Sequence, residues 1–385
     1  MSLTPAQARL AAVRGLPSAV HEVLVSKTSE GVDSEATIAK AKKLLAPEHP
    51  LSLWLADSTY PIDIRVDPDA SVYINCGPTG FARYTDTIGR TQFLDASFSP
   101  FGDDLPQTPT VFTGLASQWA ALKWTAASLA ERCLPSDVFA VDGGPSFARE
   151  SLNSASVSMQ AYAEYAGEGP KATLQCNSYE ASGDEAPLYI FDPEVGRRKF
   201  VDGSLMRSEY SIPTCLSHDA MDAQFGEVGA LARPLPLSWL LVGATGSGTP
   251  IHNHPMTAAW NTLLAGVKLW VVLPPSTPEA SLLVGESCPV HQDEDLSAHA
   301  WFRHWGTKGV ENRLPQSTII IQKPGETVFL PAGYYHCVLN VSPAATVALS
   351  CSIYLRRDWG PLGEEVARKG ECEGFQRVWE AGREG

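Results

Sequence analysis

Short apolar runs separated by turn residues make up the chain from Ala186 to Tyr354. The successive runs are PLYIFD, SWLLVG, GVKLWVVLPP, STIIIQ, ETVFLP, YYHCVLNV and TVALSCSIY, and Gly, Pro, Asp or Asn stands between them. Many short strands divided by turn residues are typical of a β-sandwich or a jelly-roll barrel. We therefore predict a mainly β core in this part of the chain.

Helical spacing of apolar residues predicts helices on either side of this region. The segments with that spacing are Pro5 to Leu45, Ser117 to Cys133, Ser156 to Ala166 and Gly363 to Trp379. Between Pro50 and Pro109 short runs again favour strands and turns. The predicted fold class is α+β, mainly β with flanking helices.

Charge and composition exclude several classes of function. The chain has 29 Lys and Arg residues against 43 Asp and Glu residues, so its net charge of −14 opposes binding to a phosphate backbone or an anionic lipid surface. No apolar run approaches the roughly 18–20 residues of a membrane-spanning helix. The eight cysteines form no Cys-x-x-Cys pair, and the N-terminal residues lack an apolar segment of secretory type. We expect buried thiols, a cytosolic or nuclear location, and neither nucleic acid nor a membrane as partner.

Two histidines in the segment GSGTPIHNHP form the sharpest local feature. His252 and His254 are two residues apart, and such residues point to the same face of a strand, so both imidazoles could reach one metal ion. A third histidine, His336, lies at the start of the later run YYHCVLNV and could complete a facial set of ligands. A His-x-His pair by itself is equally well explained by hydrogen-bonded core histidines, so the pair alone leaves both interpretations open.

Lys268 is the one charged residue in the apolar run GVKLWVVLPP. A buried ammonium group needs an anionic partner or loses its proton. A dicarboxylate cosubstrate would be such a partner, and so would an Asp or Glu of the protein.

Several motifs in a fixed order resemble one known family. They are PLYIFD (187–192), EYSIP (209–213), RPLPLSWLLVG (233–243), GSGTPIHNHP (246–255), AWNTLLAGVKLWVVLPP (259–275) and PGETVFLPAGYYHCVLN (324–340). Together they resemble the Jumonji C (JmjC) oxygenases, and within them the branch once called the phosphatidylserine receptor, to which lysyl-hydroxylase and arginine-demethylase activities are assigned. The resemblance implies a double-stranded β-helix, a cupin-like jelly roll, at residues 109–356. An N-terminal extension of unknown role (1–108) and a helical tail (357–385) would flank it.

The resemblance also implies a set of site residues. It makes His252 and His336 ligands of Fe(II), which the cosubstrate 2-oxoglutarate chelates, and it places the far carboxylate of 2-oxoglutarate on Lys268. Ser350 corresponds to a hydroxyl residue that assists this lysine. The residues that would line the cosubstrate pocket are Asn261 and Asn340, with Tyr162 or Tyr165 near it.

The second metal ligand departs from the family pattern, because His254 stands where a carboxylate is expected. No Asp or Glu occurs from Pro250 to Pro278, so no neighbour can replace it. Three neutral imidazoles would still bind Fe(II), but Zn(II), Ni(II) or Cu(II) would compete well for the same ligands.

Three hypotheses of function follow. The first is an Fe(II)- and 2-oxoglutarate-dependent oxygenase that uses O₂ to hydroxylate a protein side chain, or to demethylate it through hydroxylation. The second is a catalytically weak or inactive metal-binding module that serves as an interaction platform, which His254 favours. The third is a three-histidine dioxygenase that works without 2-oxoglutarate, against which Lys268 argues. The loops that would select a substrate, residues 279–313 and the first hundred residues, carry no recognisable signature of a substrate or of an oligomeric state.

Overall fold

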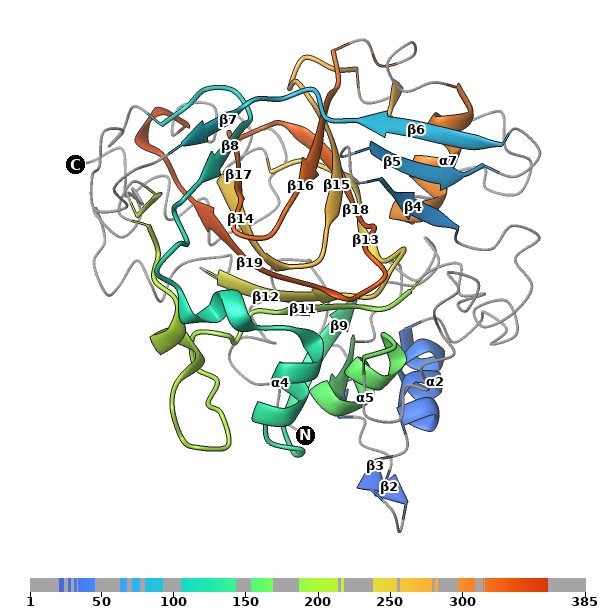
Figure 1. Cartoon of the computed structure of the whole chain (residues 1–385), viewed down its shortest axis with the longest axis vertical. Coiled ribbons are helices and arrows are strands. Elements are labelled where there is room, and N and C mark those ends of the chain that lie inside the picture. The colour runs from blue at the N-terminus through green and yellow to red at the C-terminus, as the bar shows by residue number, and fades with distance from the viewer. Residues whose placement is uncertain are drawn as a thin grey trace.

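The computed structural model, shown in Figure 1, describes part of the chain. The described residues are 21–23, 27–28, 31–32, 34–45, 63–67, 71–76, 80–92, 105–142, 154–168, 187–213, 216–217, 238–254, 257–278, 281–282, 297–308, 314 and 316–358. The helix predicted at 363–379, most of the segment 5–45 and most of the loop 279–313 lie outside them. None of the described helices has the length and apolar character needed to span a bilayer.

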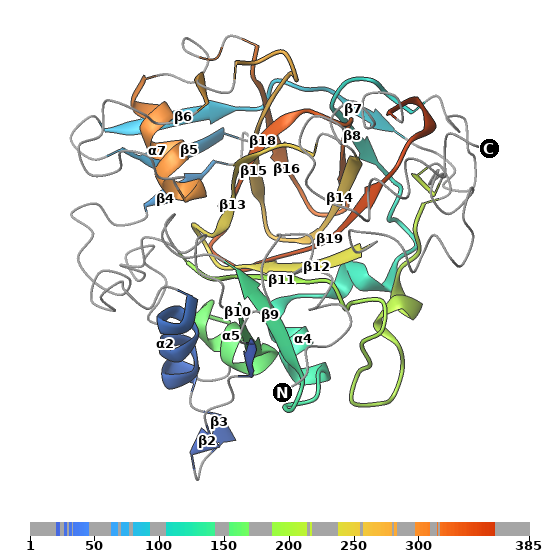
Figure 2. The same ribbon diagram turned by 180° about the vertical axis from the view of Figure 1, so that it is seen from behind.

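Two β-sheets that face each other form the centre of the described structure (Figure 1 and, from behind, Figure 2). The larger has the order β1-β10-β9-β11-β12-β19-β14-β17-β8-β7, and the smaller has the order β13-β18-β15-β16. The strands of the larger sheet are β1 (His21–Val23), β7 (Arg90–Gln92), β8 (Thr110–Thr113), β9 (Val138–Asp142), β10 (Ser154–Ser158), β11 (Tyr189–Asp192), β12 (Ser238–Gly243), β14 (Ala258–Ala265), β17 (Thr327–Leu330) and β19 (Thr346–Ile353). The smaller sheet consists of β13 (Gly248–His252), β15 (Lys268–Leu273), β16 (Thr318–Gln322) and β18 (Tyr335–Asn340).

Strand β15 shows why its sequence is an unbroken apolar run. All its residues are buried, because both of its faces are covered. Leu269 and Val271 pack into a cluster on the outer side of the small sheet. Trp270 and Val272 belong to a second cluster, which joins the two sheets across the interior.

Helices cover the outer face of the large sheet. They are α2 (Ser34–Leu45), α4 (Ala126–Arg132) and α5 (Met159–Tyr165), and their apolar side chains share one core cluster with residues of β9, β12 and β19. The single helix predicted from Ser117 to Cys133 is interrupted: a 3-10 helix, η3 (Ala120–Lys123), precedes α4. The reason is local, because the Thr125 side chain accepts a hydrogen bond from the Ser128 amide and so begins a new helix there. The prediction of a mainly β fold with flanking helices is confirmed.

A smaller layer covers the outer face of the small sheet. It consists of a sheet formed by β4 (Ile64–Val66), β5 (Ser71–Asn75) and β6 (Phe81–Thr85), together with α7 (Ala298–Lys308), as Figure 1 shows at the upper right. The remaining elements are the pair β2 (Lys27–Thr28) and β3 (Gly31–Val32) and the 3-10 helices η5 (Met206–Glu209) and η8 (Arg356–Asp358). Ile74 of β5 lies in the same buried cluster as Leu269 and Trp301, and the Tyr84 hydroxyl donates a 2.7 Å hydrogen bond to the Phe302 carbonyl. The strands β4, β5 and β6 therefore support α7 and the strands of the small sheet beneath it.

The four described cysteines are Cys76, Cys133, Cys337 and Cys351, and all are buried, as expected from the sequence.

Ile74→Ala should lower the free energy of unfolding by about 2–5 kcal/mol, because it removes a fully buried side chain from this shared cluster. Phe81→Ala is the matched control on the adjacent strand. This residue is 41 % exposed, so the loss should stay within about 1 kcal/mol. Urea unfolding followed by tryptophan fluorescence measures both, and equal losses would contradict a core shared between β5 and the small sheet.

Candidate metal centre

Backbone pairing brings two of the predicted histidines together. His252, at the end of β13, is directly paired with His336 of β18, and their ring centroids are 4.1 Å apart. On β18 the side chains alternate, so His336 and Val338 face the interior while Cys337 and Leu339 pack into the outer cluster. Strand register alone therefore places the two rings side by side.

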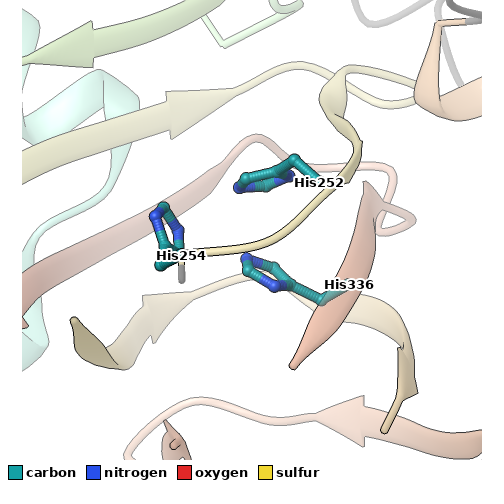
Figure 3. A group of neighbouring side chains, drawn as sticks. All are labelled: His252, His254 and His336. Carbon is teal, nitrogen blue, oxygen red and sulfur yellow. The ribbon is translucent and has the colours of Figure 1, made fainter. Parts of the chain in front are cut away.

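His254 joins them from beyond the end of its strand. The strand β13 ends at His252, and the ring centroid of His254 lies 4.9 Å from that of His252 and 5.2 Å from that of His336. The Gly333 amide donates a 2.9 Å hydrogen bond to the His254 carbonyl. Figure 3 shows the three rings converging on one point. Each offers a ring nitrogen within 4.8 Å of the others.

Hydrogen bonds to backbone carbonyls set the tautomers of two of the rings. The Nδ1 atoms of His252 and His336 lie 2.7 Å from the Pro250 carbonyl and 3.1 Å from the Tyr334 carbonyl. A carbonyl oxygen only accepts, so each Nδ1 carries the proton and each Nε2 carries the lone pair. This is the arrangement in which imidazoles bind metal ions.

Burial keeps two of the rings neutral. Desolvation, with a smaller contribution from the neighbouring His252 ring, lowers the pKa of His254 to about 3. The same causes hold the pKa of His336 well below its usual value. Neutral imidazole is the metal-binding form, so protons do not compete at these two rings near neutral pH. The donor set fits a divalent ion such as Fe(II), Zn(II), Ni(II) or Cu(II).

The three histidines share a cavity of about 70 Å³ with Lys268. Its lining residues come from β11, β12, β14, β17 and β19 on one side and from β13, β15 and β18 on the other, and most of the lining is apolar. Lys268 is paired with Asn340, and Val272 is paired with His336. Lys268 therefore stands four residues from the level of the histidines, about 13 Å along the strand. A ligand that contacts both must extend from the level of the histidines toward the Lys268 side chain.

Lys268 is buried and donates a 2.9 Å hydrogen bond to the Tyr189 hydroxyl. Burial lowers its pKa to about 7. Among the described residues no carboxylate lines the cavity or forms an ion pair with Lys268. Of the two partners that the sequence left open, an internal Asp or Glu is therefore not found in the described part of the chain.

Comparison with known proteins agrees with this geometry. Residues 239–350, which include the three histidines and Lys268, match the family described as "JmjC domain, hydroxylase". This chain contains a JmjC domain. The match begins at Trp239 in β12 and ends at Ser350 in β19.

Related proteins extend the similarity beyond the JmjC domain. The chain is 30% identical over 279 residues to the bifunctional arginine demethylase and lysyl-hydroxylase psr-1 of Caenorhabditis briggsae, covering 70% of this chain and 62% of the relative. For psr-1 of Caenorhabditis elegans the identity is 29% over 265 residues, 67% of this chain and 59% of the relative. The lysine-specific demethylase JMJ21 of Arabidopsis thaliana is 28% identical over 275 residues, 69% of this chain and 25% of the relative. The chain thus spans about three fifths of the psr-1 proteins and a quarter of JMJ21.

Two other predicted pocket residues of the JmjC domain line the cavity. Asn261 and Ser350 are paired across β14 and β19, and both are lining residues. The Ser350 hydroxyl donates a 3.0 Å hydrogen bond to the Trp260 carbonyl. The Oδ1 atom of Asn261 is buried without a partner. Asn261 thus has an amide that a cavity ligand can engage.

Asn340, in contrast, is not among the residues that line the cavity. Its Nδ2 donates to the Ser247 hydroxyl at 2.9 Å, and its Oδ1 accepts from the Thr346 hydroxyl at 2.7 Å. Its side chain also contacts the hydroxyl of Tyr189. Asn340 therefore contacts Tyr189, whose hydroxyl accepts the hydrogen bond from Lys268.

Tyr162 and Tyr165 likewise do not line the cavity. The Tyr162 hydroxyl donates to the Leu188 carbonyl at 2.6 Å, and the Tyr165 hydroxyl accepts from the Leu188 amide at 3.0 Å. They anchor the chain one residue before Tyr189, the cavity tyrosine that sequence reasoning missed. Its only signal was its place in PLYIFD, one of the motifs that carry the resemblance.

The JmjC domain should bind one divalent metal ion per chain through the three histidines. Substituting His252, His254 or His336 by Ala should weaken Co(II) or Zn(II) by about 100-fold or more, because loss of even an outer partner of a ligand costs 10- to 100-fold. Competition against a chromophoric chelator measures the affinity. His304→Ala, a change to a half-buried histidine outside the cluster, is the control and should leave affinity unchanged. Unchanged affinity in the His254→Ala variant would show that only His252 and His336 bind the metal.

Proposed function

We propose that this JmjC domain is an Fe(II)- and 2-oxoglutarate-dependent oxygenase that hydroxylates a protein side chain, or demethylates it through hydroxylation. One observation carries the proposal: three metal-competent histidines and a buried lysine without a described carboxylate partner share one cavity. A metal ion alone would explain the histidines but not Lys268. An elongated dicarboxylate explains both.

The two facing sheets support a double-stranded β-helix of the cupin-like jelly-roll type as the framework. In this interpretation the oxygenase domain occupies residues 109–356. The helices on one face and the β4–β6 layer on the other act as its outer supports. Such a core holds side chains from facing strands in one interior, which a rigid site needs.

We assign the metal to His252, His254 and His336, with Fe(II) as the working ion and Zn(II), Ni(II) or Cu(II) as competitors. Iron with 2-oxoglutarate supplies, when bound, the activation of O₂ that hydroxylation of a C–H bond requires. The protein would position the metal ligands and keep water out of the cavity. The apolar walls exclude water, while the backbone carbonyls of Pro250 and Tyr334 orient two of the imidazoles.

In this proposal the carboxylate of 2-oxoglutarate that lies far from the metal binds Lys268. A protonated Lys268 would donate to the far carboxylate, with Tyr189 orienting the ammonium group at 2.9 Å. Asn261 and Ser350, on the neighbouring strands β14 and β19, are the next polar groups in the cavity. Asn340 supports Tyr189 from behind.

The substrate proposed is an arginine or lysine side chain of a protein. The support is the printed activity of relatives: the psr-1 proteins are named as arginine demethylases and lysyl-hydroxylases, and JMJ21 as a lysine demethylase.

A second candidate function is a metal-binding module without turnover. The observation that favours it is His254, because a neutral ligand there leaves the metal one negative charge short of the two-histidine, one-carboxylate set. The experiment below separates the two.

Anaerobic addition of Fe(II) and 2-oxoglutarate to the metal-free protein should produce the visible charge-transfer absorption of the chelate, and admission of air should then release succinate. Lys268→Met is the matched variant, apolar and of similar length. It should weaken 2-oxoglutarate about 10- to 100-fold, the worth of a charge-assisted hydrogen bond, and leave Fe(II) affinity unchanged. Bound Fe(II) with neither absorption nor succinate would favour the binding module.

Affinity for 2-oxoglutarate should depend on pH through Lys268. In the protein without cosubstrate the pKa of Lys268 is about 7, and a bound carboxylate would raise it. Binding is therefore strongest below pH 7 and should fall by up to about 10-fold per unit as the pH rises above 7, with proton uptake on binding. Calorimetry at pH 8 in buffers of different ionisation enthalpy measures that uptake. Lys268→Met should abolish it, and uptake that persists in the variant would assign the proton elsewhere.

A further inference from the structure

The three histidines are held by two different kinds of structure. His252 and His336 are fixed by direct pairing between β13 and β18. His254 lies two residues past the last paired position, where the strand ladder no longer specifies its place. Something other than strand pairing must therefore hold the third ring at the cluster.

The turn between β17 and β18 provides that contact. It runs from Pro331 to Tyr334 and leads directly to His336. Within it the Gly333 amide donates its 2.9 Å hydrogen bond to the His254 carbonyl. One short turn thus connects the backbone of the outlying histidine to the strand that carries the distal one.

Two observations favour glycine at this position. Gly333 has φ +82°, a left-handed conformation that residues with a Cβ rarely adopt. A Cβ added there would also meet Pro275, just beyond β15, at 3.3 Å. Any other residue would therefore tend to turn the amide away from the His254 carbonyl.

We propose that Gly333 is the positioning residue for His254: its left-handed turn sets the third imidazole against the pair formed by His252 and His336. The proposal rests on the proposed metal site. It implies that substitution at Gly333 weakens metal binding mainly through His254.

Gly325 offers a closely matched control. It lies in the turn between β16 and β17, has φ +83°, and donates its amide to the Leu263 carbonyl at 2.8 Å. A Cβ there would meet nothing within 4 Å. Gly325→Ala therefore introduces the same backbone strain at a turn that contacts no histidine of the cluster.

The experiment measures Co(II) affinity by chelator competition and the visible absorption of bound Co(II) in the full chain. Gly333→Ala should weaken Co(II) about 10- to 100-fold, as loss of a partner that orients a ligand does, and should alter the Co(II) spectrum. Gly325→Ala should change neither. Gly333→Asn, which tolerates a left-handed φ better than Ala, should recover part of the loss and keeps the test open if the Ala variant folds poorly.

A double-mutant cycle with His254→Ala decides whether the effect passes through His254. In the His254→Ala background, Gly333→Ala should cost less than about 2-fold, because the ligand that it positions is gone. An undiminished loss in that background, or equal losses in Gly333→Ala and Gly325→Ala, would overturn the proposal. Failure of the unmodified protein to bind Co(II) or Zn(II) would overturn the metal site itself, a result distinct from either of these.

Discussion

Antiparallel pairing of β18 with β13 on one side and β15 on the other determines which side chains face the cavity. The register sets His336 opposite both His252 and Val272, and it sets Lys268 opposite Asn340. A shift of one residue would turn His336 into the outer cluster and bring Cys337 inside. The candidate centre therefore depends on the register of three strands, and that register is maintained by burial on both faces of the small sheet.

With a metal ion bound, the charges of this cavity would favour an anionic ligand. Its described lining carries three imidazoles, two of them kept neutral by burial, and a lysine whose pKa is lowered to about 7. A divalent ion would make the interior strongly positive, with no described carboxylate in the lining to balance it. A dicarboxylate would offset one of the two positive charges of the metal at one end and the charge of the lysine at the other. With His254 in place of a carboxylate, one positive charge would still remain at the centre.

The layer formed by β4–β6 and α7 has an energetic role in this arrangement. Its apolar residues share a cluster with β15, β16 and β18, and α7 packs against β13. It thereby covers the outer face of the strands whose inner faces carry His336 and Lys268. On the opposite side α2, α4 and α5 cover the large sheet. Burial on both sides stabilises the register of β13, β15 and β18.

Local pattern in the sequence was enough to predict the mainly β core between residues 186 and 354, helices near α2, α4 and α5, and the candidates His252, His254 and Lys268. Period-two spacing relates the two histidines of the first motif, and a lone charge in an apolar run identifies Lys268, because both features are properties of a few adjacent residues. The absence of a carboxylate near His254 can be read in the same way.

Tertiary structure decided the contacts between segments far apart in the chain. Asn340, Tyr162 and Tyr165, expected in or near the cavity, do not line it, and Tyr189 contacts Lys268. Tertiary structure also placed Gly333 against His254. These contacts depend on how distant strands and turns meet. Periodicity reports which face a residue occupies and carries no information about the group that it meets there.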